Sequence, residues 1–570
     1  MYKDADIEFY HDLDVLAGLG SSGRCPNHCA SELRDKLNQS SFAAPFVTQL
    51  PIRNAVTNTT FLALQHMILP HEWFANMYEK YPEAFRERIC PGHDKLNEFW
   101  REMDRHPQML GHPLKGRARF SSWAIPIALH GDGVPVTGLA KSWGKTMLFL
   151  SWCSLVGSGS TTELSFYIYG LWKLMMSKAW GRNTMRLCWR IISWSLHCLW
   201  TGEWPSHDWQ QRPLTNPMDI ARRGKRLAGN YFCVLWTLRN DLEYNYTDLG
   251  LPNSGTNEHP CTHCPANTTT MPLNDFRPGA AWRANTYDEA QWRTTQWCTH
   301  ELFNLVHGGV GLFSIMADLM HCKHLGTDQY FYGSVLWLLC FRILPHTPEA
   351  NCIFVFNRIK VLYARDKTPC RYANLFLNMF CVMSKLPTSP TGAFPCLKGR
   401  AAECRHIGKA ILEIWREHMN ASIPQHVQIR IALEKSVNIE RILDENPRTF
   451  RFTDETGIEF KDSIFTFLVM FHALASFYAS PAGGPLMLFN VTIKAHYLAH
   501  IGIMGVHMNP RLSWCYSGED FMHHARRLAS GCAKGTKPDL ISKKFCFGYS
   551  VGMHIIMTES DSPVLLFRRG

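Results

Sequence analysis

The most constraining feature of this sequence is a pair of apolar runs that are each associated with an acid. Residues 125–136 are an apolar run in which one carboxylate, Asp132, stands between two glycines. A second β-prone run, residues 231–238, is followed closely by Asp241. Carboxylate oxygens are the ligands that hard divalent cations prefer, so two acids at strand ends indicate a metal site. The alternative for each acid is an ordinary turn residue, because Asp beside glycine is common in turns.

The pattern around these acids predicts an RNase H-like α/β core. Three short apolar and aromatic runs, residues 125–131, 146–155 and 163–170, are separated by Gly and Ser and are typical of adjacent strands. Residues 185–200 have the apolar spacing of a helix, and the fourth strand follows at residues 231–238. In an RNase H-like sheet the first and fourth strands lie side by side. We therefore expect the acids at their ends to meet.

Most of the chain after the second acid is predicted to be helical. Before the sheet, we also expect helices over residues 61–78 and 82–105. After a turn-rich loop, apolar periodicity indicates helices over residues 291–306, 309–322, 329–344, 353–364, 372–383, 401–418, 427–444, 463–478 and 492–503. The mixed sheet is therefore expected to be interrupted by a large all-helical insertion.

These patterns divide the chain into five segments. A stretch rich in Pro, Gly and His before residue 118 marks the first boundary. The segments are an N-terminal mixed or helical region (1–117), the first part of the RNase H-like core (118–255), a Cys-containing loop with the helical insertion (256–490), the completion of the core with the last acidic helix (491–535), and a basic C-terminal tail (536–570).

Composition limits the classes of protein that fit. The 570 residues are 46% hydrophobic and 19% charged, which leaves material for a large folded core. The formal charge of +11 favours an anionic partner such as nucleic acid. The 20 cysteines are spread over the whole length, which is typical of a reducing compartment such as cytosol or nucleus. No run reaches the roughly 18 apolar residues of a membrane span, so we expect no membrane partner.

Four short motifs carry a resemblance to a known family. They are His130-Gly-Asp132-Gly, Asn240-Asp241 with Cys261-Thr-His-Cys264 after it, Asp318-Leu-Met-His321 followed by Leu325-Gly326, and Trp514-Cys-Tyr-Ser-Gly-Glu519. Their order over residues 120–540 resembles that of the transposase domain of CACTA (En/Spm-like) and Plavaka-type DNA transposons. Each motif alone is short, and the specificity lies in their common order and in their places at expected strand and helix ends.

This resemblance implies a DDE-type transposase, an enzyme that cuts DNA and transfers the cut strand. Its catalytic acids would be Asp132, Asp241 and Glu519, on an RNase H-like core interrupted by a helical insertion. In such sites two Mg²⁺ (or Mn²⁺) ions about 3.5–4 Å apart activate a water or a 3′-hydroxyl and stabilise the leaving oxygen. The resemblance also implies transposon-end DNA as the partner, a homo-oligomer and a nuclear location. Nearby acids that could replace the three are Glu243, Asp248 and Asp520.

Asp318 and His321 match the acid-x-x-His signature that the family carries inside the insertion. At a spacing of three residues, two side chains share one face of a helix. We expect an architectural or DNA-positioning role for this pair rather than a catalytic one. The alternative is a helix-end Asp beside an unrelated histidine.

Cys261 and Cys264 form a C-x2-C pair, which is half of a zinc site; the alternative is two plain thiols. His496 and His500 have the spacing of a metalloprotease helix but lack the glutamate that would act as base. We expect the histidine pair to form a helix face near the active site. If the fold brings them close, the second half of the zinc site could come from Cys322, His321 and His324.

Two basic clusters stand near the expected catalytic acids. Phosphate contacts by such clusters would make DNA binding strongly salt-dependent. The ordinary alternative for each cluster is a solvated helix face. The first cluster, Arg222, Arg223, Lys225 and Arg226, precedes Asp241. The second cluster, Arg526 and Arg527, follows Glu519.

Two other interpretations of the whole chain remain open. One is a domesticated or degenerate transposase that binds DNA or chromatin without catalysis. The other is a zinc-stabilised interaction protein whose resemblance to transposases is accidental. The positions of Asp132 and Asp241 test the resemblance, because a transposase needs both carboxylates at neighbouring strand ends. If the two acids lay in unrelated places, the resemblance would be accidental.

Overall fold

The fold is organised around a four-stranded mixed sheet in the order β5-β4-β3-β8. Its strands are β3 (Ala124–Pro135), β4 (Thr146–Ser154), β5 (Phe166–Trp172) and β8 (Phe232–Leu238). β3 is antiparallel to β4 and β4 to β5, whereas β8 runs parallel to β3. The first and fourth strands of the sequence pattern are therefore neighbours, as expected.

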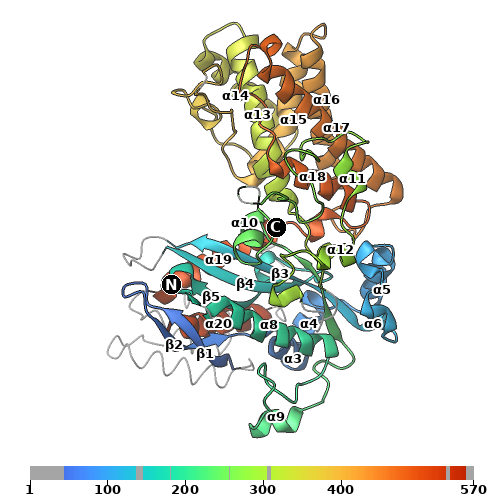
Figure 1. The fold of residues 1–570 in the computed structure, drawn as a ribbon, viewed down its shortest axis with the longest axis vertical. Helices are drawn as coiled ribbons and strands as arrows, with labels where there is room; N and C mark the ends of the chain where they lie inside the picture. Colours follow the sequence, from blue (N-terminus) through green and yellow to red (C-terminus); the bar gives the residue numbers. More distant parts are fainter. Residues whose placement is uncertain are drawn as a thin grey trace, which may run out of the picture.

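The chain combines this sheet with a separate helical region, so the fold is mixed α/β. The computed structural model describes residues 44–136, 145–179, 181–253, 255, 257–303, 310–389, 391–533 and 540–559. Figure 1 shows the sheet and its covering helices in the lower part of the molecule, and helices α13 to α18 above them. The acid-bearing ends of the strands lie in the lower part, near the junction with the helical region.

Burial on both faces explains the strand sequences. β5 and β8 are buried along their whole length, and for this reason they appear as continuous apolar runs without alternation. A parallel pair such as β3 and β8 needs a crossover connection, and α8 (Thr184–Thr201) lies in that connection and packs against β8. The side chain of Asn183 caps the start of α8, and Gly202, with a φ of 74°, ends it.

The N-terminal elements pack on the same core as the sheet. β1 (Phe46–Arg53) and β2 (Thr60–Met67) form an antiparallel hairpin. Three helices follow, α3 (Pro70–Lys80), α4 (Pro82–Arg88) and α5 (His93–Met103). The buried side chains of these elements belong to one hydrophobic cluster with the strands and with α8.

The predicted helix over residues 61–78 is wrong in its first half. Residues Thr60–Met67 are strand β2, and only the second half lies in a helix, α3. In β2 the buried side chains of Ala63, Gln65 and Met67 recur with a period of two. The backbone finds its hydrogen-bond partners in β1, a pairing that helical periodicity cannot reveal.

The helical region largely follows the sequence pattern. The predicted helices at 329–344, 353–364, 401–418, 427–444, 463–478 and 492–503 are confirmed with shifted ends. The structure has α13 (Asp328–Leu338), α14 (Pro348–Arg365), α15 (Ala401–His418), α16 (Pro424–Glu445), α17 (Asp454–Ala479) and α18 (Ile493–Met504). Their buried side chains form a second hydrophobic cluster.

Three predicted helices of the insertion are wrong over most of their length. Residues 372–383 contain only a short turn, Leu377–Met379, because the carbonyl groups of Met379 and Phe380 accept hydrogen bonds from Lys398 and Cys396. Residues 291–306 and 309–322 hold short turns in their described parts. These are the end of α12 (Glu289–Arg293), Glu301–Phe303 and Leu312–Ser314, followed by the start of a turn of π-helix, Met320–Thr327.

α17 is long and apolar enough to span a membrane by length and composition alone. In this structure it packs against α16 and α18, and its Phe and Leu side chains contribute to the second hydrophobic cluster. The helix therefore serves as a core element of the helical region.

Two helices near the C-terminus return the chain to the sheet. They are α19 (Tyr516–Ala533) and α20 (Ile541–Glu559). The expectation of a basic tail is wrong for α20, because Phe545 and Tyr549 are buried against the sheet. The hydroxyl of Tyr549 donates to the carbonyl of Ser165, 3.0 Å away. Other short helices are α6 (Phe120–Trp123), α7 (Thr161–Leu164), α9 (Pro217–Arg222), α10 (Leu242–Thr247) and α11 (Ala281–Ala284).

Candidate active site and metal centre

Asp132 lies in the part of β3 that extends beyond its pairing with β8. It stands opposite Phe149 of β4, and its carboxylate accepts a hydrogen bond of 2.6 Å from the N–H of Gly133. The N–H of Gly131 donates to the side-chain oxygen of Asn240 at 3.0 Å. Because Asn240 directly precedes the second acid, this bond ties the ends of the two acid-bearing strands together.

Asp241 follows β8 and caps α10. One of its carboxylate oxygens accepts the N–H of Tyr244 at 2.6 Å, which is an ordinary role for Asp at a helix start. The ring of Tyr244 lies against β3 at Gly131, where a Cβ would be 2.2 Å from the ring. Only glycine allows this approach. The capping bond uses one carboxylate oxygen of Asp241, so the other can bind a cation.

Glu519 reaches the same place from the first turn of α19. A Cβ on Gly518 would lie 2.2 Å from the imidazole of His130, so glycine lets α19 pack directly on β3. The guanidinium of Arg239, next to the end of β8, donates to the hydroxyl of Ser517 at 3.3 Å. These two contacts bring an acid that is distant in the sequence to the ends of β3 and β8.

The three carboxylates interact electrostatically. Burial, followed by the negative charges of Glu519 and Asp241, raises the pKa of Asp132 to about 7. Burial also raises the pKa of Glu519, and the charge of Asp241 adds to this rise. Asp241 and Glu519 thus lie near enough to Asp132 for their charges to act on its ionisation, and a cation bound among them would weaken this repulsion. The structure thus brings together Asp132, Asp241 and Glu519.

The three nearby acids that could replace the catalytic ones, Glu243, Asp248 and Asp520, are weaker candidates. Asp520 and Glu243 are exposed, as is Glu519, but the acids whose charges raise the pKa of Asp132 are Glu519 and Asp241. The pKa of Asp248 is raised by burial and, in a smaller part, by the charge of Asp241, and its carboxylate accepts a hydrogen bond from Thr247. Asp248 therefore lies at the margin of the acid cluster, and the electrostatic coupling favours Asp132, Asp241 and Glu519.

Asp318 and His321 support the third acid. The buried carboxylate of Asp318 accepts hydrogen bonds from Nδ1 of His321 at 2.6 Å and from the N–H of Cys515, just before α19, at 2.8 Å. Nε2 of His321 lies 3.8 Å from Glu519. Burial opposes a charge on His321, but the hydrogen bond to Asp318 and the charges of Asp241 and Glu519 outweigh burial and raise its pKa. The pair thus places beside Glu519 an imidazole that is more readily protonated than an ordinary histidine.

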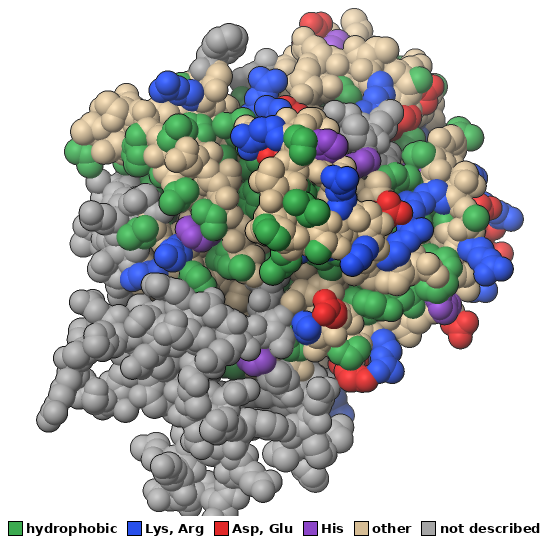
Figure 2. All heavy atoms as spheres, turned by 90° about the horizontal axis from the view of Figure 1, so that it is seen from below, with side chains coloured by type: hydrophobic (Ala, Val, Ile, Leu, Met, Phe, Trp, Pro, Cys, Tyr) green, Lys and Arg blue, Asp and Glu red, His purple; other side chains and the backbone are tan. Residues whose placement is uncertain are grey.

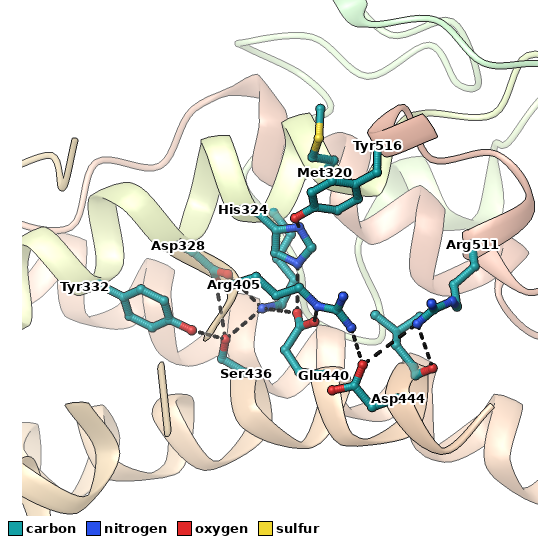
Figure 3. Close-up of polar contacts among 12 residues, drawn as sticks. Met320, His324, Asp328, Tyr332, Arg405, Ser436, Glu440, Asp444, Arg511 and Tyr516 are labelled. Carbon is teal, nitrogen blue, oxygen red and sulfur yellow. Dashed lines mark hydrogen bonds and ion pairs between the residues drawn. The ribbon is translucent and has the colours of Figure 1, made fainter. Parts of the chain in front are cut away.

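A buried network fixes the first residue of α19 to the helical region (Figure 3). The hydroxyl of Tyr516 and Nδ1 of His324 lie 2.9 Å apart, and Nε2 of His324 lies 2.9 Å from Glu440 of α16. Glu440 also forms ion pairs of 2.8 Å with Lys323 and with Arg405 of α15. Because two cations surround Glu440, they and the charge of His324 lower its pKa despite its burial.

A second cluster contains four metal-binding side chains. The ligand atoms of Cys261, Cys264, His496 and His500 all lie within 4.8 Å of one another, and all four residues are buried. The sulfur of Cys264 is 3.2 Å from Nε2 of His496, and the sulfur of Cys261 is 3.4 Å from Nε2 of His500. Two thiolates and two imidazoles at one point are the donor set of tetrahedral structural zinc.

Contacts around these four residues orient them. Nδ1 of His496 lies 2.9 Å from the carbonyl of Leu273, which leaves Nε2 to face the sulfurs. Tyr497, between the two histidines of α18, accepts the N–H of Thr262 at 3.2 Å and donates to the carbonyl of Pro260 at 3.2 Å. The loop that carries the cysteines is therefore held against α18 through its backbone as well.

The predicted partners of the cysteines are wrong. His321 is bound to Asp318 and His324 to Glu440 and Tyr516, and Cys322 lies outside the cluster of four ligands. The second half of the site comes from His496 and His500, which the sequence analysis assigned only to a helix face. Their spacing of four residues was the available signal, because one turn of helix separates two ligands on the same face.

The first basic cluster is partly occupied by ion pairs. Arg222 of α9 is held by both carboxylate oxygens of Glu72, at 2.6 and 3.0 Å, and Arg226 also pairs with a glutamate at 3.3 Å. Arg223 and Lys225 are exposed. α9 lies at the lower end of the molecule, away from α10 and α19 (Figure 1). Figure 2 views this end from below and shows Lys and Arg side chains spread among hydrophobic and acidic ones.

A comparison with known protein families finds no match for this chain, and a comparison with curated proteins finds none. Function must therefore be inferred from the geometry and chemistry of the acid cluster and of the Cys and His cluster.

In the metal-free protein, Asp132→Asn is expected to raise the free energy of unfolding, by more at high pH than at low pH. The pKa of Asp132 is about 7 in the folded chain against 3.8 for an ordinary Asp. The folded state therefore binds this proton more tightly, and the wild type loses stability as the pH rises from about 4 to about 7. Asparagine cannot ionise, so the gain at pH above about 7 should be about 1–3 kcal/mol. Urea unfolding in EDTA over this pH range measures the gain.

Asp520→Asn, at an exposed neighbour of Glu519, is the control and should change the free energy of unfolding by an amount that does not depend on pH. A pH-independent gain for Asp132→Asn would contradict the proposed repulsion.

Tyr516→Phe is expected to loosen α19. Removal of the hydroxyl leaves a ring nitrogen of the buried His324 without its partner, which costs about 1–3 kcal/mol. Hydrogen exchange of the backbone amides in residues 516–533 should become faster. Tyr167→Phe is the matched control, because the buried hydroxyl of Tyr167 has no hydrogen-bond partner among the described residues. Equal exchange in both variants would show that the network does not hold α19.

Zinc analysis tests the Cys and His cluster. The purified chain is expected to contain one zinc ion, and Cys264→Ser or His500→Ala should lose it and unfold at a lower temperature, because the metal links a loop to α18. Cys322→Ser changes a buried cysteine outside the cluster and should keep the zinc. Metal content by mass spectrometry of the purified proteins decides the point, and full zinc occupancy of both cluster variants would exclude the assignment.

Proposed function

We propose that this chain is a DDE-type transposase that cleaves DNA and transfers the strand with Mg²⁺ or Mn²⁺. The observation that carries the proposal is the set of three acids, Asp132, Asp241 and Glu519, whose charges act on one another at the junction of β3, β8 and α19. Asp132 and Glu519 both have raised pKa values, and acids perturbed in this way by burial and by neighbouring charges are typical of a functional site. Hard oxygen ligands of this kind suit Mg²⁺.

The topology supports an RNase H-like core as the scaffold of this site. Three antiparallel strands, a helix and a fourth strand parallel to the first match the expected order. The helical region lies in the chain between β8 and α19, so it has the place of an insertion before the last acid. The proposal thus accounts both for the position of the acids and for the long separation of the last two in the sequence.

Each acid has a defined part in the proposed reaction. Two bound metal ions would activate a water or a 3′-hydroxyl and stabilise the leaving oxygen. Asp132, within β3, and Asp241, at the start of α10 just after β8, would offer two ligands, and the Gly131 to Asn240 bond joins the two backbone segments that carry them. Glu519 offers the third from a helix. Asp318 positions this helix, and His321, whose pKa is raised by Asp318 and the nearby acids despite its burial, lies beside Glu519.

We also propose that Cys261, Cys264, His496 and His500 hold a structural zinc ion. Four protein ligands leave no open position, which is the arrangement of structural rather than catalytic zinc. The burial of all four residues supports this role. The zinc would join the loop after α10 to α18, the last helix before the return of the chain to the acid cluster.

DNA is the proposed partner, and transposon ends are the proposed substrate. The formal charge of +11 supports an anionic partner. Arg526 and Arg527 are exposed on α19, and Arg526 lies two helical turns after Glu519 on the same face. They therefore stay candidates for phosphate contact. A nuclear location and a homo-oligomer follow from this function and stay predictions.

Cleavage of DNA tests the proposal. With Mg²⁺ or Mn²⁺, the full chain is expected to nick a plasmid that carries the terminal repeats of its own element. Asp132→Asn, Asp241→Asn and Glu519→Gln should each reduce the rate at least about 100-fold, because loss of a metal ligand removes several kcal/mol of transition-state stabilisation. Gel analysis of nicked plasmid over time gives the rate.

The matched control is Asp520→Asn, which removes an exposed acid next to Glu519 and should leave the rate within about twofold. If Asp520→Asn lost activity and Glu519→Gln kept it, the third catalytic acid would be Asp520 rather than Glu519. Equal nicking by the wild type and Asp132→Asn would exclude the catalytic assignment. DNA binding by the wild type without any cleavage would favour the alternative, a non-catalytic protein derived from a transposase.

A further inference from the structure

A groove close to the acid cluster is lined by cations and hydroxyls. It has a volume of about 730 Å³ and lies between α5, the end of β4, the loop between α16 and α17, and the segment before α19. None of its lining residues in the described chain is Asp or Glu. Six hydroxyl side chains contribute, from Ser154, Ser158, Thr161, Ser165, Thr449 and Ser517. Four cations contribute, from Lys95, Arg239, Arg448 and Arg511. Such a lining fits a ligand with many phosphate oxygens.

Arg239 is a half-buried cation whose partners are neutral. Its guanidinium donates to the carbonyl of Leu512 at 2.7 Å, to the sulfur of Cys153 at 3.1 Å and to the hydroxyl of Ser517 at 3.3 Å. Among the described residues these contacts include no carboxylate. A partly buried charge without a counter-ion is unfavourable, so an anion in the groove would be stabilising.

Arg448 stands on a loop that the fold holds in place. The side-chain amide of the buried Asn509 donates to the carbonyls of Asn446 and Thr449 at 2.9 and 3.0 Å. On the other side of Arg448, the ring of Phe450 packs at 5.0 Å from that of Phe99 in α5. Arg448 itself is exposed. A fixed loop that presents an exposed guanidinium to a groove is suited to bind an anion from solvent.

The other two cations have weak partners. Lys95 pairs with Glu98 at 2.8 Å, and both side chains are more than a third exposed. Arg511 lies 3.8 Å from Asp444, which also binds Arg405, so one acid serves two cations (Figure 3). Exposed ion pairs contribute little, and a phosphate can compete for the cation. The groove therefore keeps a positive balance.

The groove and the acid cluster are formed by the same two chain segments. Arg239 precedes Asp241 by two residues, and Ser517 precedes Glu519 by two residues. The two groove residues are also hydrogen-bonded to each other. A chain of phosphates that lies along the groove would therefore pass to the carboxylates of Asp241 and Glu519. A single small anion would gain nothing from this continuity.

We propose that this groove binds the phosphate backbone of the DNA whose scissile phosphate lies at the acid cluster. The inference rests on the proposed function, because it assigns the path of the substrate to that site. Lys95 and Arg448 contribute from the outer walls, and Arg239 contributes at the end next to the acids.

DNA binding by the full chain in EDTA tests the groove without cleavage. Fluorescence anisotropy with a labelled mixed-sequence duplex should show at least about tenfold weaker binding for Lys95→Ala/Arg448→Ala, and a slope of log affinity against log salt that is lower by about 1–2. The matched control is Arg101→Ala/Lys360→Ala, which removes two exposed cations outside the groove, the first on α5 and the second on α14. This control should bind within about twofold of the wild type.

The outcomes separate the groove from the proposed function. If the affinity of the groove variant were unchanged, or if the control variant lost affinity equally, the groove would not be the DNA-binding site. Cleavage by the wild type would then still support the proposed function. Weaker binding in the groove variant alone, together with no cleavage by any protein, supports the groove and removes the function. The labelled duplex is also competed with ATP, with inorganic pyrophosphate and with unlabelled DNA at the same millimolar concentration of phosphate. If either small anion displaced the duplex as effectively as the unlabelled DNA, the groove would be a small-anion site and the proposal would be overturned.

Discussion

The repulsion among three neighbouring carboxylates, Asp132, Asp241 and Glu519, is the constraint on which the arrangement of this fold depends. Burial, followed by the charges of Glu519 and Asp241, raises the pKa of Asp132 from 3.8 to about 7, so ionisation of this acid without a cation costs about 1–3 kcal/mol. This is a large part of the net stability of a domain. Asp132, Asp241 and Glu519 therefore stay together only because contacts outside the cluster hold their backbones. The two hydrophobic clusters supply that stability, one beneath the sheet and one in the helical region.

Four consecutive residues before the last acid are each anchored to a different element. The N–H of Cys515 is bound to Asp318, and the hydroxyl of Tyr516 to His324. The hydroxyl of Ser517 accepts from Arg239, and Gly518 touches His130 of β3. The position of Glu519 is thus determined by the helical region and by the sheet together. A helix held on both sides can present an acid to repelling neighbours, whereas a helix held on one side would move away.

The sequence predicted the parts of the fold that depend on local patterns. The four strands and α8 follow from apolar runs and helical spacing, and the expected RNase H-like order placed the first strand beside the fourth, although the direction of their pairing was not predicted. Strand β2 was missed because Ala63, Gln65 and Met67 alternate within a run that also fits a helix. The network of Tyr516, His324 and Glu440 could not be predicted, because its members come from three segments that only tertiary packing brings together. Asp318 and His321, which support the third acid, were found through their motif, whereas the contact of Tyr516 with His324 was not predicted.

The Cys and His cluster explains how a long helical region can lie between two acids that must meet. Cys261 and Cys264 stand shortly after Asp241, and His496 and His500 shortly before Glu519. The cluster therefore joins the entry of the helical region to its exit, close to both acids in the sequence. Bringing the ends of a long segment together costs entropy that grows with its length, and a bound metal at the junction would offset that cost. Between these two ends, the helices can build their own core without moving the carboxylates. The region thus contributes to the acid cluster mainly through the few contacts at its base, which is where Asp318, His321 and His324 lie.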